Sequence, residues 1–132
     1  MVSLDVWSFV PGPTTNPPQS SVVLSDFVEY PPQEIARAIM AFPGMRLRHA
    51  DDQDWWQWSA EWRQGRRHIG IGMTLMQTEP ESWGGSQLNG ACDLTDILGL
   101  WGTIRSRCPG VWMHNIDCDI HTSESFTQLF PA

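Results

Sequence analysis

The chain has 132 residues and a formal net charge of −7, which comes from 15 Asp and Glu against 8 cationic residues, all of them Arg. Nucleic-acid phosphates need clustered cations, so this balance argues against nucleic-acid binding and suits a protein that meets a basic partner. Because the chain has no Lys, a Schiff-base lysine, a pyridoxal-phosphate anchor and a phosphate-loop lysine are excluded.

The length predicts a single domain over residues 1–132. Three cysteines make an odd number without framework spacing, and no signal-peptide pattern follows Met1, so we expect reduced thiols and a cytoplasmic location. No apolar run approaches the ~18 residues of a membrane span, and we therefore expect no membrane partner. The sequence does not predict an oligomeric state.

The first third of the chain predicts a strand, a loop and a helix. Residues 2–10 are rich in β-branched and aromatic residues on both faces, which indicates a central strand. Residues 11–21 form a Pro-rich loop with polyproline character, and residues 22–30 fit a strand and a short helical turn equally well. Pro31 and Pro32 then favour the start of a helix that ends before Pro43 and Gly44.

A short alternating strand over residues 45–48 precedes the clearest local pattern, a β-hairpin over residues 54–77. A two-residue turn at Gln64-Gly65 would place Ser59 opposite Gly70 and Gln57 opposite Gly72. It would also place Glu61 opposite His68, where the two side chains could form an acid–base pair or a cross-strand ion pair. In that register one face is apolar and the other polar, as a half-buried sheet requires. The residues expected to be buried on the apolar face are Trp56, Trp58, Ala60, Trp62, Ile69, Ile71 and Met73.

The last third predicts a weak strand over residues 84–91, a helix capped by Asp93, a strand over residues 111–121 and a short helix over residues 122–130. Together these elements indicate an α+β fold, a mostly antiparallel sheet with two main helices packed on one face.

The densest polar cluster lies in residues 114–121, which contain two His, two Asp and one Cys. Strand alternation sends His114 and Cys118 to one side and Asp117, Asp119 and His121 to the other, so the cluster lacks the converging ligands of a zinc site. Cys118 also has no family signature of a nucleophile. We therefore expect no metal, no cofactor and no catalytic residue.

The polar face of the hairpin is the candidate binding surface. Gly70 and Gly72 leave bare backbone there, which often marks close approach by another group. Either the Pro-rich segment 11–21 or a partner covers this strip, and we favour the intramolecular cover. The candidate partner-binding residues are Trp55, Gln57, Glu61 and His68, together with Asp51, Asp52 and Asp54, which precede the hairpin.

Two classes of function follow. The first is a small acidic cytoplasmic protein-binding module, such as an inhibitor or immunity-type protein that neutralises a basic partner. The alternative is a small-molecule-binding protein or enzyme with a pocket between sheet and helices. Convergence of a polar set in one cleft would favour the alternative. That set is Glu61, His68, His114, Asp119 and His121.

Overall fold

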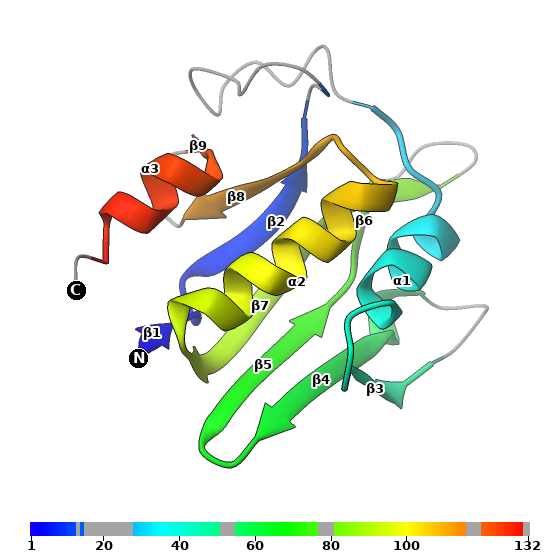
Figure 1. The fold of residues 1–132 in the computed structure, drawn as a ribbon. Helices are drawn as coiled ribbons and strands as arrows, with labels where there is room; N and C mark the ends of the chain where they lie inside the picture. Colours follow the sequence, from blue (N-terminus) through cyan, green and yellow to red (C-terminus); the bar gives the residue numbers. More distant parts are fainter. Residues whose placement is uncertain (13, 15–27, 51–54, 77–80, 116–119, 131–132) are drawn as a thin grey trace.

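The fold is that of a computed structural model that describes residues 1–12, 14, 28–50, 55–76, 81–115 and 120–130. Within these residues the chain forms nine strands, three α-helices and one 3₁₀ turn (Figure 1). The strands are β1 (Val2–Ser3), β2 (Trp7–Pro11), β3 (Arg46–His49), β4 (Ser59–Gln64), β5 (Arg67–Gly72), β6 (Thr74–Met76), β7 (Ser82–Cys92), β8 (Val111–Asn115) and β9 (Ile120–His121). The helices are α1 (Pro32–Met40), α2 (Leu94–Arg107) and α3 (Ser123–Gln128), and the 3₁₀ turn is η1 (Trp55–Gln57).

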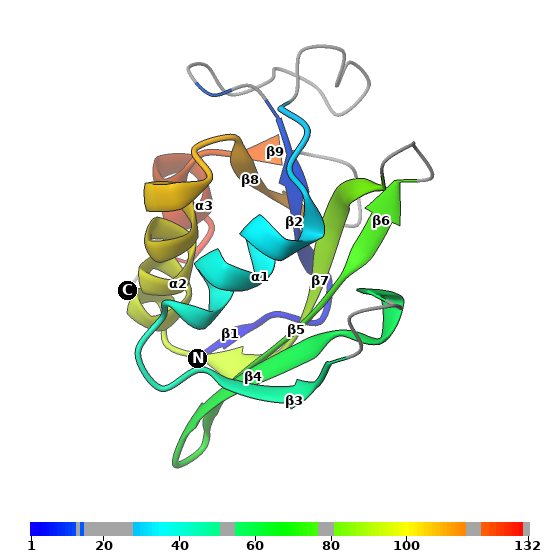
Figure 2. The same ribbon diagram turned by 90° about the vertical axis from the view of Figure 1, so that its right-hand side faces the viewer.

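The sheet follows the order β3-β4-β5-β7-β2-β8-β9, and β1 and β6 also pair with β7. Every pairing is antiparallel. The structure thus confirms an α+β fold with a mostly antiparallel sheet. α1 and α2 contact each other, as the turned view in Figure 2 shows, and the packing of both on one face stays a prediction. Among the helices of the described residues, none is long and apolar enough to cross a membrane.

The helices begin where the sequence predicts, because their caps are local. α1 has Pro32 at its first position, where a missing N–H costs no hydrogen bond. At α2 the Asp93 N–H donates to the Asp96 carboxylate at 2.9 Å, which forms a capping box. At α3 the Ser125 N–H donates to Thr122 Oγ1 at 3.1 Å.

Two predicted strands are each divided. Residues 2–10 split into β1 and β2, because the Trp7 N–H donates to the Leu4 carbonyl at 3.0 Å and turns the chain. Residues 111–121 split into β8 and β9, which pair antiparallel with Met113 opposite His121. Residues 22–27, and most of the loop 11–21, lie outside the described residues, and residues 28–30 belong to no helix or strand.

The weak strand predicted over residues 84–91 is the longest strand of the described sheet. β7 runs from Ser82 to Cys92 and pairs with β1, β2, β5 and β6. The Gly and polar residues of β7 have low strand propensity, which weakens the prediction from sequence. Pairing with four other strands stabilises β7 in spite of this low propensity.

The predicted hairpin register is wrong by two residues. Ser59 lies opposite Gly72, and Glu61 lies opposite Gly70, so the turn residues are Gly65 and Arg66. Gly65 takes φ +61°, and the first turn position of a two-residue hairpin loop favours a residue that tolerates positive φ. Because side chains alternate with period two, a shift of two residues leaves both faces unchanged. Six of the seven side chains predicted on the apolar face are therefore buried, namely Trp58, Ala60, Trp62, Ile69, Ile71 and Met73.

The prediction for Trp55 and Trp56 is also wrong. Trp56 is 53% exposed, whereas Trp55 is partly buried and packs against the core. Both residues lie in η1, where the Trp58 N–H donates to the Trp55 carbonyl at 3.1 Å. A 3₁₀ turn has three residues per turn, so strand alternation does not apply to this segment.

Most of the eight tryptophans belong to the core. Two of them also satisfy their ring nitrogens there: Trp83 Nε1 donates to Ser86 Oγ and Trp101 Nε1 donates to the Val111 carbonyl, each at 3.0 Å. The buried tryptophans are Trp7, Trp58, Trp62, Trp83, Trp101 and Trp112. Trp content therefore reflects packing more than recognition.

Candidate functional site

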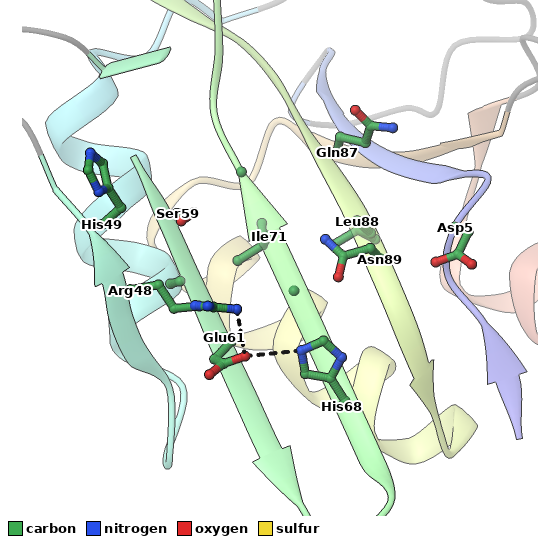
Figure 3. A pocket seen from close by; sticks show the side chains of 13 residues that line it. Asp5, Arg48, His49, Ser59, Glu61, His68, Ile71, Gln87, Leu88 and Asn89 are labelled. Atoms are coloured by element: carbon green, nitrogen blue, oxygen red, sulfur yellow. Dashed lines mark hydrogen bonds and ion pairs between the residues drawn. The ribbon is translucent and has the colours of Figure 1, made fainter. Parts of the chain in front are cut away.

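The candidate site is the outer sheet face, the face of β4, β5 and β7 that is turned away from the buried core. A hollow of about 730 Å³ opens on this face. Figure 3 views it with helix ribbons behind the sheet. The polar or glycine residues that line it are Asp5, Arg48, His49, Ser59, Glu61, His68, Gly70, Gly72, Gln87 and Asn89.

Glu61 lines this hollow and contacts two neighbours. Its Oε2 accepts from Arg48 Nη1 at 3.4 Å and lies 3.2 Å from His68 Nε2 (Figure 3). The side chains of Glu61 and His68 are 26% and 21% exposed. The predicted Glu61–His68 contact is therefore present. This contact joins diagonal positions of β4 and β5, because Glu61 is directly opposite Gly70. The contact is an ion pair when the His68 imidazole is protonated.

The two glycines of the outer sheet face differ in what lies over them. A Cβ at Gly70 would overlap the Asn89 amide, with 2.7 Å to its Cγ, so Asn89 on β7 is the group that approaches this backbone. At Gly72 no atom lies within 4 Å of a Cβ position. The expected cover by segment 11–21 falls mostly outside the described residues. Over Gly70 the observed cover is instead Asn89.

The rim of the hollow is fixed from both sides. His49 Nε2 lies 3.2 Å from Gln57 Oε1, so η1 is joined to β3, and Gln57 contacts a residue that lines the hollow. On the opposite side Asp5 Oδ1 accepts from the Gly90 N–H at 3.0 Å. Gly90 has φ +103°, and a Cβ there would overlap the His68 carbonyl oxygen, so this position requires glycine.

A second hollow of about 440 Å³ adjoins the first, because Asp5 and Gln87 line both. It extends the recessed surface across β2 to His114 on β8 and includes Val6, which is half-exposed. The recessed surface thus crosses most of the sheet and is not confined to the hairpin.

The remaining predicted residues are dispersed. Trp55 lines a different hollow, next to Tyr30 and the start of α1. His121 Nδ1 lies 3.1 Å from Ser125 Oγ, and the His121 ring packs edge-on against Trp7. Outside the described residues lie Asp51, Asp52, Asp54, Asp117, Cys118 and Asp119.

Sequence reasoning missed five residues of the hollow. Gln87 and Asn89 alternate with buried Leu88, which is the polar-apolar pattern of a half-buried strand. That pattern was available in the sequence. Asp5, Arg48 and His49 come from segments whose proximity to the hairpin depends on β-pairing at long range, which no local pattern reveals.

The two described cysteines are free and buried. Burial, reinforced by the Asp96 charge, raises the pKa of the Cys92 thiol to about 11, and burial also raises the pKa of Cys108. Both thiols therefore act as small apolar groups and are poor nucleophiles. Within the described residues, no three His, Cys, Asp or Glu side chains are placed to share a metal ion.

Comparison of this chain with protein-family models, with curated proteins and with solved structures finds no match. Proposals about its function therefore depend on the site itself.

Proposed function

We propose that this chain is a protein-binding module, such as an inhibitor or immunity-type protein, and that it meets its partner with the outer sheet face. The observation that carries the proposal is the pair of adjoining hollows that recess this face from β4 to β8. In this account α1 and α2 both cover the opposite, apolar face of the sheet. The outer face, with its fixed polar side chains, is left for the partner.

The shape of the surface favours a protein over a small molecule. Small-molecule sites enclose most of their ligand and are lined mainly by apolar groups. Here the larger hollow is lined mostly by polar side chains, and strands together with Asp5 supply its lining. A specific protein interface needs about 800 Å² on each partner. Two hollows that share Asp5 and Gln87 offer a continuous surface for such contact.

The polar residues of the enzyme alternative that the structure describes do not converge in one hollow. Glu61 and His68 line the larger hollow, whereas His114 lines the smaller one. His121 contacts Ser125 and Trp7 instead. A Glu61–His68 pair with Arg48 beside it is also what ordinary cross-strand ion pairing provides, so we propose the binding module first.

A basic partner fits the charge of the chain. The net charge is −7, and the larger hollow has two carboxylates, Glu61 and Asp5, against one Arg, Arg48, which pairs with Glu61. Opposite charge on a partner speeds encounter and fixes register more than it adds affinity. The proposal retains the cytoplasmic location that the sequence analysis expects, and it assigns Asp51, Asp52 and Asp54 a steering role.

The test begins with capture of partners from the source cell on immobilised protein. Amide hydrogen exchange of the complex then maps the contact, with Glu61→Gln as the site variant. Glu34→Gln is the control, because Glu34 is an exposed carboxylate of α1 that pairs with Arg37. We expect protection of β3, β4 and β5 and weaker binding by Glu61→Gln alone. Protection confined to α2 and α3, or equal binding by both variants, would contradict the proposal.

A further inference from the structure

A separate hollow of about 480 Å³ lies at the start of α1 and combines aromatic walls with carboxylates. Tyr30 and Trp55 supply the rings, and Pro31 and Pro32 supply a further apolar wall. Glu29 and Glu81 supply the carboxylates of the lining. Rings beside unpaired carboxylates are the combination that proteins use to hold organic cations.

The Tyr30 wall is fixed before any ligand arrives. The Tyr30 hydroxyl accepts a hydrogen bond from the Gly110 N–H at 2.8 Å, and the Tyr30 backbone carbonyl accepts one from the Trp83 N–H at 2.7 Å. Its ring also packs against that of Trp83, with centroids 6.5 Å apart. Burial raises the pKa of the Tyr30 phenol, so the ring stays neutral. A fixed wall lowers the entropy cost of binding.

The two carboxylates have no cation of their own among the described residues. Glu29 and Glu81 are exposed, and neither forms an ion pair with a described residue. All eight Arg lie within the described residues. The hollow therefore presents two carboxylates that form no ion pair with the described residues.

The start of α1 offers this hollow few N–H groups for an anion, that of Gln33 among them. A helix N-terminus attracts anions through free N–H groups, but Pro31 and Pro32 have none. The Glu34 N–H already donates to the Pro31 carbonyl at 3.1 Å. The acidic side chain of Glu34 in the first turn also partly neutralises the positive charge at this end of the helix dipole.

We propose that this hollow binds an arginine side chain of an extended segment of a partner protein. The planar guanidinium stacks on Trp55 or Tyr30 while Glu29 and Glu81 accept its hydrogen bonds, a geometry that suits Arg better than Lys. The inference goes beyond the outer sheet face and does not depend on it, since the two hollows share no described lining residue. η1 joins them only in sequence, with Trp55 in one and Gln57 contacting the other.

The probe is the capped peptide acetyl-Gly-Ser-Arg-Ser-Gly-amide, with citrulline in place of arginine as its neutral match. Binding is followed by the indole N–H resonance of Trp55, which a Trp55→Phe variant assigns. We expect a saturable shift with a dissociation constant of about 1 mM, the range of a single side-chain contact. The double variant Glu29→Gln/Glu81→Gln should weaken it about tenfold, and citrulline should give no saturable shift.

Trp56 supplies the matched control, because it is the next residue, is more exposed and does not line the hollow. Trp56→Phe should bind the arginine peptide as the unchanged protein does. Equal shifts with arginine and citrulline, or full affinity in the double glutamine variant, would overturn the proposal. Tetramethylammonium binding as tightly as the peptide would also overturn it, because that cation donates no hydrogen bond to the carboxylates. The glutamine changes fall on exposed side chains, and circular dichroism checks that the fold is retained.

Discussion

The contact between Asn89 and the backbone of Gly70 makes a quantitative prediction about the outer sheet face. In Gly70→Ala the new Cβ overlaps the Asn89 amide, with 2.7 Å to both Cγ and Nδ2. The amide must rotate away, and a strained rotamer costs about 0.5–1.5 kcal/mol. Overpacking of a core in general costs ~1–3 kcal/mol. We expect Gly70→Ala to lower the free energy of unfolding by about 1–2 kcal/mol.

The same change should be harmless once Asn89 is shortened. In an Asn89→Ala background the Cβ at position 70 meets no amide, and Ala in a strand is favoured over Gly by about 0.5 kcal/mol. The double-mutant cycle should therefore give a coupling of about 1.5–2.5 kcal/mol, the cost with Asn89 plus the gain without it. Gly72→Ala is the control, because no atom lies within 4 Å of its Cβ position, and it should be neutral or slightly stabilising.

Urea unfolding followed by tryptophan fluorescence measures all four proteins of the cycle and the control. An unchanged denaturant slope shows that the native state keeps its compactness. If Gly70→Ala costs the same with and without Asn89, then Asn89 does not cover Gly70. The pairing of Gly70 with Asn89 and the floor of the larger hollow would then be wrong.

Three further predictions concern the backbone, the thiols and the acidic run. Gly90→Ala should cost about 2–4 kcal/mol in the same urea assay, because φ +103° and the His68 carbonyl both oppose a side chain; a neutral result would contradict this backbone geometry. The folded-state pKa of Cys92 is about 11, above the roughly 8.5 of an exposed thiol, so its contribution to stability is full below pH 8.5 and is lost as the pH rises toward 11. The difference in unfolding free energy between the unchanged protein and Cys92→Ala should therefore shrink over that range, and a constant difference would refute the shift. Changing Asp51 and Asp52 to Asn should slow association with a captured partner more than it speeds dissociation, with a smaller effect in high salt; stopped-flow kinetics showing the change only in dissociation would refute a steering role.

The parts of the fold that sequence predicts correctly are those set by local chemistry. α1 begins at Pro32, α2 begins after Asp93, which is capped by Asp96 three residues later, and both helices end before a Pro-Gly pair. The apolar face of the hairpin is also correct, because alternation survives a register error of two residues. The register itself was missed, since it depends on which residue accepts a positive φ in the turn.

The parts that sequence misses depend on contacts at long range. Trp55 and Trp56 lie in a 3₁₀ turn, where strand alternation does not apply. Trp56, predicted to be buried, is therefore exposed, and Trp55, predicted to be exposed, is partly buried. Glu61 and His68 were correctly placed together. Asp5 and Asn89, by contrast, reach the same hollow only through pairing of β7 with strands far away in sequence. The meeting of Asp5 and Asn89 with the hairpin in one hollow was therefore beyond any local pattern.

The central claim is that the outer sheet face is the binding surface, and two glycines allow a direct test of it. Neither Gly72, in the larger hollow, nor Gly102, on α2, has an atom within 4 Å of a Cβ position, so each accepts a new side chain without an initial clash. The measurement is the dissociation constant of a captured partner for Gly72→Trp and for Gly102→Trp. We predict that Gly72→Trp, which fills the hollow, weakens binding at least about a hundredfold, the loss of an interface hot spot, while Gly102→Trp binds as the unchanged protein does. Equal affinity of the two variants would contradict the claim.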